Sequence, residues 1–183
     1  GILVFFGAPL SAGDDPERAI ACAIEMQSIM PEINRFQRQN NLPQLSMGIG
    51  INTGKVVVGN IGSEKRTKYG AVGTPINTTY RIESHTVGGQ VLISNWTYEK
   101  TSTQLKLRDS FQVQFKGIDH PVTLYDVAGI EGKYAVFLPE AQVEALTHLK
   151  MPLMVSCFPL EGKKVSEKSI QGQITDLAVS EAD

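Results

Sequence analysis

The residues best suited to chemistry lie in one short stretch, KYGAVGTPINTTYRIE, at positions 68–83. The spacing in its second half predicts a helix over residues 75–84, in which Asn77 and Arg81 lie one turn apart on the same face. An amide can hydrogen-bond a sugar or ring oxygen, and a guanidinium presents a planar fork of donors that suits phosphate oxygens. The pair indicates a site that stabilises charge developing on a phosphoryl group, although a solvated helix-surface Asn and Arg would show the same spacing.

Other residues that often bind metals or act as nucleophiles are scattered. His85, His120 and His148 have no partner at metal-ligand spacing, so we interpret them as surface or loop residues. Cys22 and Cys157 form no C-x-x-C motif, and we interpret them as reduced core thiols, which favours a cytoplasmic protein. The sequence predicts no metal ligands in this chain.

The elements that must position the pair alternate between helices and hairpin-linked strands. Asp14 and Asp15, followed by Pro16, predict the start of a long helix that ends near residues 40–41. The other predicted elements are a strand over 2–6, a hairpin of 45–52 with 55–61, a mobile loop over 62–68, a strand over 90–93, a short helix over 95–101, and antiparallel strands over 105–116 and 122–129. This order favours an α+β fold with helices packed on a sheet.

Two glycines in the first strand of that predicted hairpin need an explanation. Gly48 and Gly50 alternate with Met47, Ile49 and Ile51. A small residue inside a strand lets another backbone or a ligand come close. Packing of a helix on the sheet makes the same demand, so both interpretations stay open here.

The composition argues against several classes of function. The 183 residues carry 17 Lys and Arg against 19 Asp and Glu, a net charge of −2, whereas nonspecific nucleic-acid binding needs a strongly positive field. No apolar run approaches the roughly 18–20 residues that cross a bilayer, so we expect no membrane contact from this segment. The length suits one domain with a small addition.

Both ends of the sequence are unusual for a complete protein. The chain starts with the apolar run GILVFF and no Met, so we expect a fragment of something longer. We interpret residues 131–150 as a linker, with a helix from residue 138, and residues 151–183 as the start of a second, β-rich domain.

A set of motifs connects residues 1–130 with a known family: GILVFFGAPL with DDPERAIACAIEMQ, MGIGINTGKVVVGNIGS, YGAVGTPINTTYRIES, GGQVLIS and FKGIDHPVTLYDVAGI. In this order they resemble the class III nucleotide cyclase catalytic domain of the bacterial adenylate cyclase type. The hairpin motif GIGINTGKVVVGNIG is the most specific of them. The resemblance implies a ferredoxin-like α+β fold, with helices packed on a mostly antiparallel sheet whose first strands are missing here.

The resemblance also implies an activity. Such domains convert ATP into 3′,5′-cyclic AMP and pyrophosphate in signal transduction, using Mg²⁺ or Mn²⁺ held by two aspartates, at the seam of a head-to-tail homodimer. By this resemblance, Asn77 orients the ribose, Arg81 binds the α-phosphate as charge builds, and Lys116 contacts the terminal phosphates. An upstream sensor domain is expected as a further partner.

The sequence departs from the family in two ways. Both metal aspartates are expected before Gly1, so this chain alone is predicted to be inactive. Gly70 occupies the base-selecting position, where many bacterial members have Thr or Asp, and only backbone groups near Ala71 remain to meet the base. These departures leave ATP against GTP open. They also keep one alternative function, a degenerate cyclase-like module that dimerises or senses nucleotide without turnover.

The tail has a resemblance of its own. Residues 151–183 partly resemble the opening strands of a PilZ cyclic-dinucleotide-binding domain. They contain no arginine for the R-x3-R pair of that family, and DLAVSE, from Asp176, matches only part of its second motif.

Overall fold

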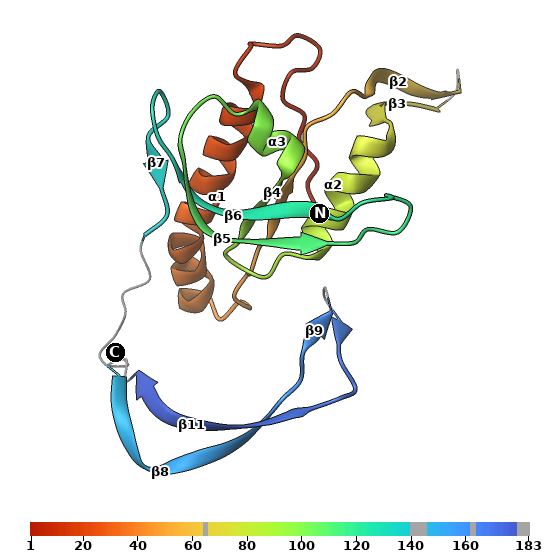
Figure 1. Cartoon of the computed structure of the whole chain (residues 1–183). Helices are drawn as coiled ribbons and strands as arrows, with labels where there is room; N and C mark the ends of the chain where they lie inside the picture. The colour runs from red at the N-terminus through yellow and green to blue at the C-terminus, as the bar shows by residue number, and fades with distance from the viewer. Residues whose placement is uncertain (64–65, 140–145, 162–163, 179–183) are drawn as a thin grey trace. The chain divides into compact units, whose positions relative to one another are not determined.

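The structure, a computed structural model, describes four stretches of the chain: residues 1–63, 66–139, 146–161 and 164–178. They belong to two compact units, Gly1–Leu138 and Pro139–Asp183, so the boundary between the units falls within residues 131–150. Figure 1 shows the elements of each unit.

The long helix predicted near the start of the chain is confirmed as α1, Asp15–Gln39. Pro16 stands in its first turn, where a helix needs no backbone N–H donor. The buried apolar side chains recur at helical spacing and form one stripe: Ile20, Ala21, Ala23 and Ile24. This stripe packs α1 on the sheet of the first unit.

The strand predicted over residues 2–6 is wrong. The structure describes residues 1–14 in full, and they contain no strand. Ile2 is 80% exposed and Val4 is 55% exposed, so this apolar run packs on neither helix nor sheet along most of its length. An apolar pattern predicts a strand only where a neighbouring strand is there to pair its backbone groups.

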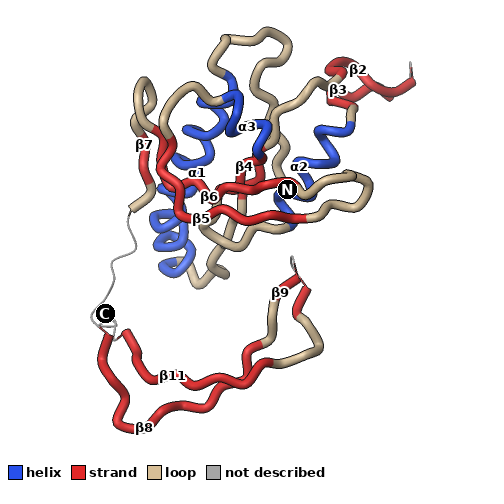
Figure 2. The backbone as a smooth tube through the Cα atoms, in the orientation of Figure 1, coloured by secondary structure: helices blue, strands red, loops and turns tan. Residues whose placement is uncertain are grey.

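A five-stranded sheet carries the helices of the first unit, and four of its strands lie in the order β1, β4, β6, β5. Figure 2 shows β4, β6 and β5 of this sheet. Their bounds are Ile49–Ile51 for β1, Val91–Ser94 for β4, Val122–Ile130 for β6 and Leu105–Val113 for β5. The fifth strand, β7, spans Val136–Phe137 and pairs with the end of β6. β1 and β4 are parallel, and the other pairs are antiparallel. The predicted α+β fold is confirmed.

Both faces of the sheet are covered by helices. Successive side chains of a strand point to opposite faces, so β4 contributes to the packing on each of them. Val91 and Ile93 of β4 pack with the stripe of α1. Leu92, between them, packs with Ile82 of α2, the helix Thr74–Ser84. Full burial of β4 is typical of a strand that is covered on both sides.

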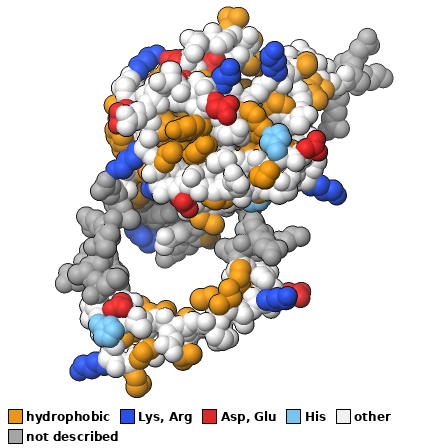
Figure 3. Space-filling model, viewed as in Figure 1, with side chains coloured by type: hydrophobic (Ala, Val, Ile, Leu, Met, Phe, Trp, Pro, Cys, Tyr) orange, Lys and Arg blue, Asp and Glu red, His pale blue; other side chains and the backbone are white. Residues whose placement is uncertain are grey.

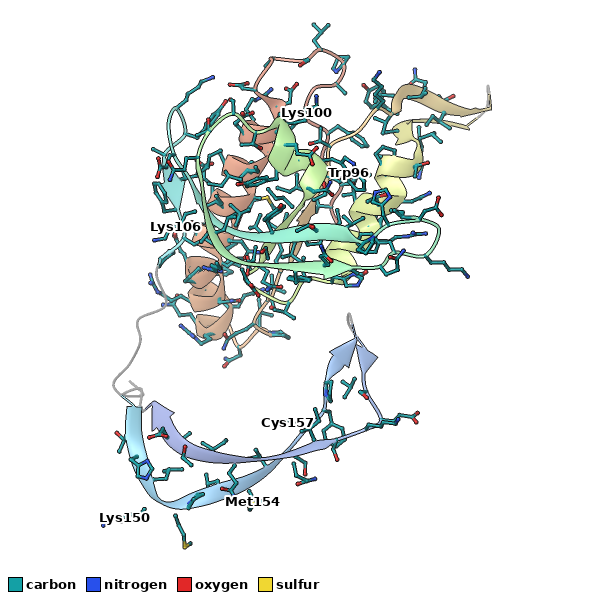
Figure 4. The ribbon with its side chains drawn as sticks, in the orientation of Figure 1. Trp96, Lys100, Lys106, Lys150, Met154 and Cys157 are labelled. Atoms are coloured by element: carbon teal, nitrogen blue, oxygen red, sulfur yellow. The ribbon has the colours of Figure 1, made fainter. Side chains whose placement is uncertain are left out.

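The short helix predicted after β4 is confirmed as α3, Asn95–Lys100. Ser94 caps it, since its hydroxyl accepts a hydrogen bond from the Thr97 N–H at 3.3 Å. Trp96 lies on α3 (Figure 4) and packs against the cluster of Ile82 and Leu92.

The predicted hairpin of residues 45–52 with 55–61 is wrong. β1 pairs with β4 instead, and the true hairpin joins β2, Val57–Ser63, to β3, Arg66–Val72. The predicted loop over 62–68 therefore lies within these two strands, apart from residues 64–65, which are outside the described part. We call β2 and β3 the β2–β3 arm; Figure 1 shows it next to the start of α2.

Gly48 and Gly50 serve helix packing, one of the two interpretations left open by the sequence. A Cβ on Gly50 would lie 2.5 Å from the backbone N of Glu83 in α2 and 2.9 Å from its Cα. A Cβ on Gly48 would lie 1.9 Å from the hydroxyl of Thr86, just after α2. The glycines thus let the end of α2 approach the sheet closely.

In the described residues of the second unit, the regular secondary structure consists of strands. β8, Leu146–Cys157, pairs with β11, Ile170–Ala178, and β9, Leu160–Glu161, pairs with β10, Lys164–Val165, both antiparallel. The helix predicted from residue 138 is wrong where it can be compared, because residues 146–150 belong to β8; residues 140–145 lie outside the described part. Apolar side chains are exposed on this unit (Figure 3), and Met154 of β8 is one of them (Figure 4).

None of the three helices in the described part combines the length and the apolar character that a bilayer span requires.

Candidate functional site

The predicted helix over residues 75–84 is confirmed as α2, and it carries the Asn77 and Arg81 pair. Thr78 and Ile82, each the next residue along, are buried against the sheet. Asn77 is exposed and Arg81 is half-buried, so the face that carries the pair lies beside the buried one. The helix is seated by its inner side and leaves the amide and the guanidinium at the surface.

The start of α2 is clamped by the segment that follows β1. The Asn52 side-chain amide donates to the Pro75 carbonyl at 3.1 Å, and the Asn52 amide oxygen accepts from the buried Ser94 hydroxyl at 2.7 Å. A Cβ on Gly54 would lie 2.5 Å from the ring of Pro75. Because residues 52–54 contact the helix in this way, the chain leaves the sheet here and does not form the tight turn that the sequence predicted.

The structure brings Arg81 and Lys116 together. The Arg81 Nη1 donates a hydrogen bond to the backbone carbonyl of Lys116. The Lys116 side chain is exposed, and Lys116 lies in a turn after β5, since β5 ends at Val113 and not at residue 116 as predicted. The backbone of a turn distant in sequence therefore meets the Arg81 guanidinium at the end of α2, and this turn carries Lys116.

The end of α2 makes a second contact with the same turn. The rings of His85 and Phe115 meet edge to face, with centroids 5.4 Å apart, and Phe115 is buried. His85 Nδ1 lies 2.8 Å from the Arg81 carbonyl oxygen, which can only accept, so Nδ1 is the donor. His85 lies in the turn after α2 and is half-buried, in agreement with its interpretation as a surface or loop residue, but the sequence did not predict these contacts. The spacing of four from Arg81 to His85, on the same helical face, is the signal that sequence reasoning missed.

Gly70 and Ala71 lie on a different element, the β2–β3 arm. Gly70 is opposite Gly59 and Ala71 is opposite Val58. A Cβ on Gly70 would meet only the Ile61 Cδ1, at an ordinary 3.7 Å, so this position has room for a side chain that the sequence does not use. β3 leads into α2 through Gly73, which links these two residues to the Asn77 and Arg81 pair along the chain.

The acidic residues before α1 have a structural role. Asp14 is the N-cap residue, but its carboxylate makes no capping bond and instead accepts from Lys133 Nζ at 2.7 Å and the Tyr134 hydroxyl at 2.8 Å. Hydrogen bonds from these two side chains lower the pKa of Asp14. The Asp15 carboxylate accepts from the Ser11 hydroxyl, which lowers its pKa. The two residues thus mark the start of α1 as predicted, with Asp14 at the N-cap position, but the hydrogen bonds of their carboxylates go to other partners than the helix N–H groups.

The described part of the chain has no cluster of metal-binding side chains of the size that a protein metal site needs. No group of three or more His, Cys, Asp or Glu side chains there could hold a metal ion. The two cysteines are free, and Cys157 is exposed, not buried as predicted.

Comparison with known proteins gives one family. Residues 3–129 match the family described as "Adenylate and Guanylate cyclase catalytic domain". The chain is 28% identical over 131 residues to Adenylate cyclase 1 of Rhizobium meliloti, an alignment that covers 70% of this chain and 20% of that protein. The chain therefore spans about a fifth of the length of this curated relative.

Two solved structures are similar as well. The guanylyl cyclase Cya2 is 52% identical, with a TM-score of 0.70, over 73% of this chain and 68% of that one. The adenylyl cyclase CyaB from P. aeruginosa is 31% identical, with a TM-score of 0.58, over 67% of this chain and 64% of that one.

Proposed function

The chain belongs to the adenylate and guanylate cyclase catalytic domain family, and on this premise we propose that it converts ATP into 3′,5′-cyclic AMP and pyrophosphate in cyclic nucleotide signalling. The observation that carries the proposal is the contact between Arg81 and the Lys116 carbonyl at the end of the helix that also presents Asn77. It places the turn that carries Lys116 beside the helix that carries Asn77 and Arg81, and an amide and two cations are the groups that suit a sugar and a triphosphate.

Each of these side chains has a role in the proposed reaction. The ribose 3′-oxygen attacks the α-phosphorus, the 3′-hydroxyl proton leaves, and the bond from the α-phosphorus to the leaving pyrophosphate breaks. Asn77 orients the ribose so that the 3′-oxygen faces the phosphorus. Arg81 stabilises the charge that builds on the α-phosphate, and Lys116 binds the terminal phosphates.

The site needs a second subunit and divalent metal ions. Cyclase domains of this family act as dimers and use divalent metals, and we propose a head-to-tail homodimer with Mg²⁺ or Mn²⁺. The described residues do not fit a metal site of their own, because they contain no group of three or more His, Cys, Asp or Glu side chains that could hold a metal ion. We therefore assign them no metal-dependent step, and we propose that this chain alone does not turn over.

GTP is the second candidate substrate, for a specific reason. The solved guanylyl cyclase Cya2 is 52% identical to this chain over their aligned part, and Gly70 offers the base no side-chain hydrogen bond. A site discriminates between two bases when the wrong base leaves polar groups of the site without a hydrogen-bond partner. The base preference then rests on backbone groups near Ala71.

Complementation in trans tests the proposal. This chain is mixed with a cyclase chain of the family that keeps its metal aspartates and lacks its own Asn and Arg pair, and cyclic nucleotide is measured from ATP and from GTP with Mg²⁺ or Mn²⁺. We expect product from the mixture, and a roughly 100- to 1000-fold lower rate with Arg81→Ala. Arg35→Ala, an exposed arginine on α1, is the matched control and leaves the rate unchanged.

The outcomes separate the alternatives. Product from ATP at a higher kcat/KM than from GTP supports the adenylate cyclase, and the reverse order supports the guanylate cyclase. A silent mixture with both nucleotides, while the chain still dimerises or binds nucleotide, favours the alternative module that senses without turnover.

The setting of the domain is part of the same proposal. We place it in the cytoplasm, after an upstream sensor domain and before a second, β-rich domain from residue 151. The free state of both cysteines supports a reducing compartment.

A further inference from the structure

The chain reverses direction between β5 and β6 in a closed turn over residues 115–118. The Ile118 N–H donates to the Phe115 carbonyl at 3.1 Å, which closes four residues into one turn. Gly117, the third residue, has φ +79°, whereas Lys116, the second, is not among the residues of positive φ. This combination is that of a type II turn.

A type II turn decides which way its central carbonyl points. Compared with the commoner type I turn, the central peptide is rotated by roughly 150–170°, and its carbonyl points to the other side of the turn. Here that carbonyl belongs to Lys116, and it accepts the hydrogen bond of Arg81 Nη1. In a type I turn the acceptor would face away from the guanidinium.

The turn is also attached to α2 independently of this hydrogen bond. Phe115 is buried and its ring contacts His85, whose Nδ1 binds the backbone carbonyl of Arg81. The Gln114 side-chain amide donates to the Ile118 carbonyl, which supports the turn from the opposite side. The position of the turn is thus set by packing, and the direction of its central peptide is set by Gly117.

We propose that Gly117 is a positioning residue for Arg81. By holding the Lys116 carbonyl toward α2, it keeps the guanidinium on the helix face that carries Asn77 and fixes it before a substrate arrives. The consequence for turnover rests on the proposed function, because there Arg81 must meet the α-phosphate in one orientation.

Gly117 could also serve only to let the chain turn, without any effect on Arg81. A matched glycine elsewhere, Gly89, distinguishes this role from the positioning role. Gly89 has φ +85°, and a Cβ at either glycine meets nothing within 4 Å. An alanine therefore suffers the same backbone strain and the same lack of contacts at both positions. Only Gly117 carries a carbonyl neighbour that binds Arg81.

The first measurement concerns the side chain of Arg81 itself. The whole chain is labelled with isotope-enriched arginine, and the Arg81 guanidinium signals are identified by their loss in Arg81→Lys. In the unchanged chain the hydrogen bond slows rotation of the Nη group, so we expect separate signals for its protons. Gly117→Ala should average them, whereas Gly89→Ala should keep them separate. Gly117→Asn should retain much of the separation, since asparagine adopts positive φ more readily than alanine.

The second measurement is turnover in the complementation assay. We expect Gly117→Ala to lower kcat by about tenfold to a hundredfold, with a smaller change in KM, because an orienting contact acts mainly in the transition state. Gly89→Ala should leave kcat unchanged at equal stability, and Gly117→Asn should restore much of it.

Each result decides a separate point. Separate Arg81 signals in Gly117→Ala would overturn the anchoring, whatever the activity, and averaged signals with unchanged kcat would overturn the positioning role. If Gly117→Ala does not fold, Gly117→Asn is compared with Gly89→Asn: a partial loss of the signal separation in Gly117→Asn alone supports the anchoring, and full separation in both variants overturns it. If the unchanged mixture yields no cyclic nucleotide, the proposed function fails, and the arginine signals still decide whether Gly117 anchors Arg81.

Discussion

The contact between Gly50 and α2 gives the sharpest prediction about the fold. Gly50→Ala places a methyl group 2.5 Å from the backbone N of Glu83, 2.9 Å from its Cα and 3.1 Å from the carbonyl carbon of Ile82. All three atoms belong to a helix backbone, which cannot rotate aside as a flexible side chain can. The helix as a whole must move away from the sheet.

The size of the effect follows from these distances. To restore an ordinary contact of 3.4 Å from 2.5 Å, α2 must shift by about 0.9 Å. Overpacking of this kind costs about 1–3 kcal/mol, which lowers the ratio of folded to unfolded chain by roughly 5- to 150-fold. The same shift displaces Asn77 and Arg81, and a displacement of about 1 Å can lower a catalytic rate by about 100-fold.

Urea unfolding followed by tryptophan fluorescence measures the stability term. Trp96 is the single tryptophan and packs in the cluster that contains Ile82, so its emission reports the side of the sheet that α2 covers. The matched control is Gly59→Ala on the β2–β3 arm, where a Cβ meets nothing within 4 Å and the expected change is within about 0.5 kcal/mol. Equal unfolding midpoints for the two variants would refute the reasoning, because the close approach of α2 to β1 would then cost nothing to disturb.

Three further predictions concern single side chains. Burial raises the pKa of Asp126, so its carboxyl ionises at a lower pH in the unfolded chain than in the folded one, and the folded chain loses stability as the pH rises through this range. Asp126→Asn should therefore gain stability relative to the unchanged chain from pH 3 to pH 7, as measured by the midpoints of urea unfolding. A difference between the two midpoints that stays constant with pH would contradict this. Asn52→Ala removes the donor to the Pro75 carbonyl and the acceptor of the buried Ser94 hydroxyl, which should cost about 1–3 kcal/mol of unfolding free energy in the same assay. Gly70→Asp adds a hydrogen-bond acceptor at a position that has room for a side chain, and a carboxylate accepts from the adenine amino group and repels the guanine carbonyl oxygen. The ratio of kcat/KM for ATP to kcat/KM for GTP should therefore rise by about tenfold in the complementation assay. An unchanged ratio would show that Gly70 does not belong to the base site.

Local spacing predicted much of the first unit. Patterns within a few residues of one another predicted the helices α1, α2 and α3 and the antiparallel strands β5 and β6. The hairpin failed because a turn signal at Thr53 and Gly54 competes with contacts that lie far along the chain, at Pro75 and in β4.

The candidate site divides in the same way. That Asn77 and Arg81 share a helix face is a property of the sequence by itself, because helical geometry repeats every 3.6 residues whatever surrounds it. Which partner holds Arg81 was decided by the tertiary structure alone: the Lys116 carbonyl lies 35 residues away and faces the guanidinium only because the turn is seated on α2 and flipped by Gly117. A backbone carbonyl has no side-chain identity to read in a sequence, and its direction exists only once distant segments have packed together.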